Sequence, residues 1–171
     1  MAIQQQTSAQ YFKSLNILHY ILAAAQLLFA ILAFILQKEN EFTITPASNA
    51  LRYAVSLIAV MGVTGGAILY QKQVNAIKSR KNLSDKLTAY RSVIIARGAF
   101  LEFPSLFAII AFVLTGEILF LGLTGSLIAL FVFLRPTKEK VIKDLQLSAE
   151  EILFINNDDS IVNETEVNDD E

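Results

Sequence analysis

An apolar run at residues 91–115 constrains this chain more than any other part of its sequence. The run is long enough to cross a bilayer as a helix, because about 20 apolar residues span the hydrocarbon core. It nevertheless contains an acid, Glu102, which lies roughly 16 Å beyond Arg91 at a helical rise of ~1.5 Å per residue. A charge near the middle of a bilayer costs several kcal/mol unless neighbouring groups accommodate it. We therefore expect Glu102 to be protonated and to face other helices.

Three further apolar runs accompany this one, and 54% of the residues are hydrophobic, which is more than a soluble domain usually contains. In the first run, residues 23–25 resemble a signal-peptide cleavage site, which is the alternative interpretation. Because apolar sequence continues to Leu36, we favour an uncleaved helix. The predicted spans cover about residues 15–36, 51–70, 92–115 and 118–134. The predicted fold class is all-α: a polytopic membrane protein with an antiparallel bundle of four transmembrane helices.

Outside the membrane domain, residues 15–135, the chain is polar and its charge is unevenly distributed. Residues 1–14 form a short N-terminal segment. Residues 136–155 are predicted to form short amphipathic helices, and Ser148 with Glu151 matches a capping box. Residues 156–171 are acidic and are expected to be a disordered tail.

The basic residues set the expected orientation, because cytoplasmic loops carry an excess of Lys and Arg. Most of them lie in a polar hairpin between the second and third spans and directly after the fourth span. This pattern predicts a plasma (inner) membrane protein with both termini in the cytoplasm. The hairpin is expected to bind anionic lipid headgroups or a cytoplasmic partner rather than nucleic acid, through Lys78, Arg80, Lys81, Lys86 and Arg91. Val74 and Ile77 are expected to meet Leu83, Leu87 and Tyr90 across it.

A layer of polar and small residues is predicted at the depth of Glu102 in all four spans. Glu102 is expected to form a hydrogen bond to Gln26, Thr64 or Ser126, which together are the candidate proton-binding or cation-binding residues. His19, on the same face of the first span as Gln26, is expected to be a packed imidazole; the alternative is a proton relay.

Small residues mark the faces where helices can approach closely. Gly62 and Gly66 form a small-xxx-small pair in the second span, for which we favour packing within one bundle over dimerisation. The other glycines expected to pack helices are Gly98, Gly122 and Gly125.

The residue inventory disfavours an enzyme. The chain has no cysteine and a single histidine, so a thiolate or multi-histidine metal site is excluded and no metal or cofactor is expected. No nucleophile–base pair or phosphate-binding loop is present.

Part of the chain resembles a known hairpin. The resemblance covers roughly residues 56–113 and rests on Gly62-Val-Thr-Gly-Gly66, the basic turn, and Gly98-Ala-Phe-Leu-Glu-Phe-Pro-Ser-Leu-Phe-Ala-Ile-Ile-Ala111. This pattern is similar to the glycine helix, polar loop and carboxylate helix of rotor-ring c subunits. In that family the acid matching Glu102 carries the translocated proton or sodium ion. The repeated Gly-x-Gly stripe is missing, and Ser79-Arg-Lys-Asn82 stands where the family has Arg-Asn-Pro or Arg-Gln-Pro. As a whole the chain resembles uncharacterised small four-helix inner-membrane proteins of bacteria, which implies no activity.

Two functions remain open at this point. The first is a non-enzymatic structural, assembly or partner-binding component of the membrane, whose partner is a second copy of the chain or another membrane-complex protein. The alternative is an ion-handling subunit in which Glu102 binds a proton or cation.

Overall fold

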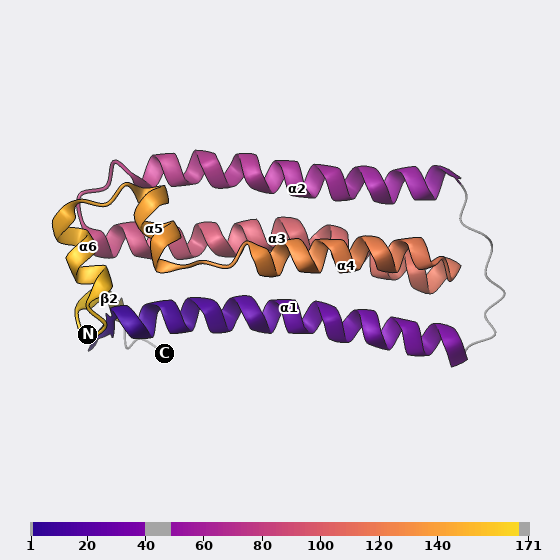
Figure 1. Ribbon diagram of the computed structural model, residues 1–171, viewed down its shortest axis with the longest axis horizontal. Helices are drawn as coiled ribbons and strands as arrows, with labels where there is room; N and C mark the ends of the chain where they lie inside the picture. The colour runs from indigo at the N-terminus through magenta and orange to yellow at the C-terminus, as the bar shows by residue number, and fades with distance from the viewer. Residues whose placement is uncertain (1, 40–48, 168–171) are drawn as a thin grey trace. The chain divides into compact units, whose positions relative to one another are not determined.

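The structure is a computed structural model that describes residues 2–39 and 49–167. Within these ranges the chain forms six α-helices and two β-strands. Figure 1 labels the six helices and β2. Their bounds are β1 (Ala2–Thr7), α1 (Ser8–Glu39), α2 (Asn49–Ile77), α3 (Leu83–Thr115), α4 (Ile118–Phe133), α5 (Lys138–Leu145), α6 (Ala149–Asn156) and β2 (Ile161–Val167). The predominance of helices confirms the predicted helical class, whereas the two strands were not predicted.

The apolar helices have the length and composition of membrane spans. In the described part of the chain, α1, α2 and α3 are each long and apolar enough to cross a membrane. A fourth crossing is counted if α4 and α5 are taken together as one broken span. The helices α1, α2 and α3 extend beyond the spans predicted from the sequence, because helical backbone continues into the flanking polar residues.

The chain divides into two compact units. One unit, here called the strand-containing unit, consists of Met1–Leu18, Tyr70–Ile95 and Pro136–Glu171. The other, the four-helix unit, consists of His19–Leu69 and Ala96–Arg135. Three long helices therefore contribute residues to both units, and each unit is described separately below.

The core of the strand-containing unit is built on the predicted hairpin. Val74 and Ile77 of α2 are buried in one cluster with Leu87 and Tyr90 of α3, and Leu83 packs against it, as the sequence predicts. The same cluster contains α1, α5, α6 and β2 side chains, namely Tyr11, Phe12, Leu15, Val141, Leu145, Ile155 and Val162. Buried apolar surface thus joins the N-terminal, hairpin and C-terminal segments of the sequence.

The two strands correct the expected disordered tail. Strands β1 and β2 form an antiparallel two-stranded sheet in which Ala2 is opposite Val167. Asn163 of β2 explains part of this order, because its Oδ1 accepts hydrogen bonds from Ser84 at 3.1 Å and Thr88 at 2.9 Å. Its Nδ2 donates to Gln6 Oε1 at 3.3 Å. Residues 168–171 of the predicted tail lie outside the described residues.

The two short helices predicted for residues 136–155 are present as α5 and α6. Thr137 caps α5 by accepting a hydrogen bond from the backbone N–H of Lys140. The predicted capping box of α6 is confirmed: Ser148 accepts from the Glu151 backbone, and Glu151 accepts from the Ser148 N–H. Capping of this kind stabilises a helix N-terminus by about 1 kcal/mol.

In the four-helix unit, glycine allows a close contact between α2 and α3. Pro104 lies inside α3 and has no N–H, so the carbonyl of Phe100 lacks its usual helical donor. A Cβ atom placed on Gly62 would lie 2.6 Å from that carbonyl oxygen and 2.3 Å from Pro104 Cγ. Only glycine fits at this position without movement of α3.

Candidate functional site

The acid singled out by the sequence lies on α3, within the four-helix unit. Glu102 is half-buried, and the polar side chain that interacts with its carboxyl group is Gln26 of α1. Gln26 is only 2% exposed. Its Nε2 and Oε1 nevertheless make no hydrogen bond of regular geometry. The structure therefore brings Gln26 and Glu102 together and leaves the carboxamide with unused donor and acceptor capacity.

Two hydroxyl groups lie in the same interior. Ser105 is one helical turn beyond Glu102, is fully buried, and has no hydrogen-bond partner for its Oγ. Thr124 of α4 is 1% exposed and donates from Oγ1 to the backbone oxygen of Ser105 at 3.4 Å. Ser105 was not among the residues predicted for the site. Its position three residues after Glu102 on one helical face was the signal that could have identified it as polar lining.

Together these four residues form a cluster, here called the Glu102 cluster: Gln26, Glu102, Ser105 and Thr124. They come from α1, α3 and α4. A buried polar atom without a partner costs about 1–3 kcal/mol, so such atoms are uncommon in folded proteins. Carboxyl, carboxamide and hydroxyl oxygens can bind a proton or a hard cation, and the same groups can hydrogen-bond a polar side chain of another helix.

Two other predicted partners of Glu102 are directed elsewhere. Thr64 Oγ1 donates to the backbone oxygen of Val60 at 2.7 Å, and Ser126 Oγ donates to that of Gly122 at 2.9 Å. Both side chains are exposed and bond within their own helices. This is the usual arrangement for a hydroxyl residue on an apolar helix, where the preceding turn offers the nearest acceptor. The expectation that either one is bonded to Glu102 is therefore corrected.

His19 is packed away from the Glu102 cluster. Its Nε2 lies 2.9 Å from the backbone oxygen of Phe131, and the imidazole stacks on the Phe131 ring at a centroid distance of 4.2 Å. Because a carbonyl oxygen only accepts, this contact requires the proton on Nε2. The geometry is that of a packed, hydrogen-bonded imidazole.

The predicted packing glycines divide into two groups. A Cβ on Gly66 would lie 2.9 Å from Phe100 Cβ, and one on Gly98 would lie 3.3 Å from the Phe131 ring, so both positions contact a neighbouring helix. Gly62 belongs to the same group. By contrast, a Cβ on Gly122 or Gly125 meets nothing within 4 Å, so the packing role expected of these two glycines is corrected for the described residues.

The predicted basic surface is smaller than expected. Lys86 is 8% exposed, and its Nζ lies 2.7 Å from Glu151 of α6, so it cannot serve a lipid or an external partner. Arg91 is half-buried. Arg80 and Lys81 are exposed and Lys78 is partly exposed, and these three remain available on the hairpin.

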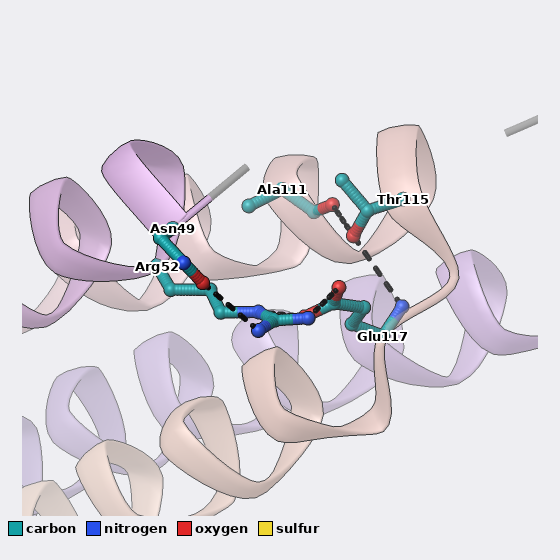
Figure 2. A network of polar contacts seen from close by, with 5 residues as sticks. All are labelled: Asn49, Arg52, Ala111, Thr115 and Glu117. Atoms are coloured by element: carbon teal, nitrogen blue, oxygen red, sulfur yellow. Dashed lines mark hydrogen bonds and ion pairs between the residues drawn. The ribbon is translucent and has the colours of Figure 1, made fainter. Parts of the chain in front are cut away.

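Sequence reasoning missed an ion pair in the four-helix unit, which Figure 2 shows. Arg52 of α2 donates from Nε and Nη2 to both carboxylate oxygens of Glu117, at 2.9 and 2.7 Å, and from Nη1 to Asn49. Glu117 precedes α4, and its backbone N–H donates to Thr115 Oγ1 at 3.3 Å. The sequence did contain a signal for this ion pair. Arg52 and Glu117 have opposite charges and flank apolar runs on the same predicted side of the membrane, where they can meet.

In the part of the chain that the structure describes, no group of three or more His, Cys, Asp or Glu residues could hold a metal ion. Three helices, or four with the broken pair, have the length and apolar composition of membrane spans, which indicates a helical protein of the membrane class. Comparison with family models, curated proteins and solved structures gives no match to this chain.

Proposed function

We propose that the chain is a four-span inner-membrane protein with both termini in the cytoplasm, acting as a non-enzymatic assembly or partner-binding component. The supporting observation is the position of Glu102, whose carboxyl group meets Gln26 from another helix and yet stays only half-buried. A protonated acid in this position can join α1 to α3 and can offer its remaining hydrogen-bonding capacity to a further membrane helix. The partner is a second copy of the chain or another membrane protein.

A second candidate function is proton or cation binding at the Glu102 cluster. It is favoured by the buried Gln26 carboxamide, which meets the acid, and by the buried Ser105 hydroxyl one helical turn along α3, which has no hydrogen-bond partner. These oxygens, with the carboxyl group, are ligands that suit a proton or a hard monovalent cation.

The Glu102→Gln variant tests the assembly candidate. For an assembly role, the neutral isostere retains hydrogen bonding, so the free energy of unfolding in detergent should change by less than about 0.5 kcal/mol. Glu102→Ala, the matched control, should lower it by about 1–2 kcal/mol, because Gln26 loses its neighbour. Unfolding is measured by titration with a denaturing detergent.

Carbodiimide labelling supplies the complementary readout, because the reagent modifies a protonated carboxyl group. Labelling of Glu102 that is unaffected by sodium and by raised pH supports the assembly role. Protection by sodium at constant ionic strength, or by raised pH, contradicts it and favours the proton-binding or cation-binding candidate.

The proposed topology makes a prediction of its own. The chain contains no cysteine, so single cysteines can be introduced without background labelling. In intact cells, a membrane-impermeant maleimide should label Asn49→Cys, at the start of α2, but not Ser79→Cys in the basic hairpin. Ser79→Cys should react only after the membrane is permeabilised. Labelling of Ser79→Cys in intact cells would reverse the proposed orientation.

A further inference from the structure

A groove in the strand-containing unit lies between the end of α2 and the start of α3, with a volume of about 450 Å³. Its apolar lining comes from Ile77, Ala89 and Val93, which belong to the hairpin core or pack against it. The groove therefore has a floor fixed by the packing of two helices. By contrast, a groove in the four-helix unit between α2 and α3 is lined by apolar residues such as Met61 and Phe103.

The polar lining of this groove comes from four side chains, Gln73, Arg80, Thr88 and Ser92. The Thr88 hydroxyl already donates to Asn163, which leaves only its lone pairs for a ligand. The guanidinium of Arg80 and the carboxamide of Gln73 retain donor capacity, whereas the Ser92 hydroxyl donates its proton to the backbone oxygen of Thr88 at 3.5 Å. A groove with several donors and one cation suits a phosphate oxygen.

The charge of Arg80 is not neutralised within the described residues. Its Nη1 donates to the backbone oxygen of Asp85 at 3.1 Å, and no carboxylate of the described chain forms an ion pair with it. The nearby carboxylate, that of Asp85, accepts instead from Asn82 at 3.4 Å. Exposed Lys81 adds positive charge on the same turn. The groove therefore favours an anion.

The sequence positions of the lining residues suit the membrane surface. Gln73 follows the second apolar run by one helical turn, and Ser92 opens the third. In the proposed topology, both positions fall at the headgroup level of the cytoplasmic leaflet, where basic residues attract anionic lipids.

We propose that this groove binds the headgroup of an anionic phospholipid, an inference that rests on the proposed membrane topology. Arg80 pairs with the phosphodiester, and Gln73 donates a hydrogen bond to one of its oxygens. The glycerol portion contacts Ala89 and Val93 on the floor. Because Thr88 is also bonded to Asn163, a bound headgroup lies next to the link between α3 and the terminal sheet.

The test titrates the purified full-length protein in detergent with phosphatidylglycerol or phosphatidylcholine and counts bound lipids by native mass spectrometry. Arg80→Gln should weaken phosphatidylglycerol binding at least fivefold, as expected for the loss of a basic residue worth about 1 kcal/mol at an anionic surface. Lys81→Gln is the matched control, because it removes the same charge outside the groove lining, and it should change binding less than twofold. Ala89→Leu, which fills the floor without changing charge, should also weaken binding.

Equal losses for Arg80→Gln and Lys81→Gln, or equal affinity for the two lipids, would overturn the proposal in favour of unspecific attraction. Displacement of phosphatidylglycerol by an equimolar amount of inorganic phosphate would assign the groove to free phosphate and also overturn it. Lipid binding in detergent does not depend on orientation. An error in the proposed topology would show separately, as maleimide labelling of Ser79→Cys in intact cells.

Discussion

Replacing Gly62 with alanine is expected to lower the free energy of unfolding by about 2–3 kcal/mol, because overpacking a tight helix contact strains both helices. The added methyl group would lie 2.3 Å from Pro104 Cγ and 2.6 Å from the Phe100 carbonyl oxygen, and the latter belongs to the backbone and cannot rotate away. Unfolding in detergent, followed by circular dichroism, measures the change.

Gly122→Ala is the matched control for this substitution. It makes the same chemical change in a helix, but a Cβ at Gly122 meets nothing within 4 Å. Its stability should be unchanged or slightly raised, since alanine has the higher helix propensity. Equal destabilisation by the two variants would contradict the close contact between α2 and α3.

The second large effect is expected at Lys86. Lys86→Met removes the partner of Glu151 while keeping an unbranched apolar stem, and should cost about 2–3 kcal/mol because a largely buried carboxylate is left unpaired. Lys138→Met breaks a more exposed pair with Asp158 and should cost less than about 1 kcal/mol. Chemical denaturation of the three proteins provides the comparison.

The pH dependence gives an independent check on the same pair. Burial alone raises the pKa of Glu151, but hydrogen bonds from Lys86 and Ser148 outweigh it and hold the pKa below its usual value. A depressed folded-state pKa means that the pair stabilises the fold above the unfolded-state pKa, and that this contribution is lost as the pH falls through the folded-state value. Lys86→Met should flatten this acid-side decrease in stability. An unchanged acid profile would show that the pair does not contribute to it.

Much of the helical framework could be predicted because its signals are local. The apolar runs locate α1 to α4, and the Ser148 and Glu151 spacing locates the start of α6. The sheet could not be predicted, because β1 and β2 are polar and their pairing joins opposite ends of the chain. A strand of this kind is stabilised by distant contacts such as those of Asn163, which no local pattern reveals.

The candidate site could be predicted only in part, because the sequence indicates how deep a residue lies along its helix but not which way it faces. Helical depth places Gln26 and Glu102 at one level, and the structure brings them together. Depth does not determine rotation about the helix axis, so Thr64 and Ser126 turned out to bond within their own helices, while Ser105 and Thr124 point inward. Likewise, the charge of Lys86 indicated a surface residue, but its ion pair with Glu151 is formed by a helix far along the sequence.

The ion pair of Arg52 and Glu117 has a consequence for the surrounding lipid. Helix α4 begins one residue after Glu117 and contains 16 residues, so it is roughly 24 Å long, less than the ~30 Å hydrocarbon thickness of an average bilayer. In the proposed four-span arrangement, this hydrophobic mismatch draws the two leaflets together beside α4. The turn between α3 and α4 then lies close to the hydrocarbon core. Because the guanidinium of Arg52 and the carboxylate of Glu117 neutralise each other, the free-energy cost of holding their charges there is lower. The protein is then expected to partition into thinner regions of the membrane.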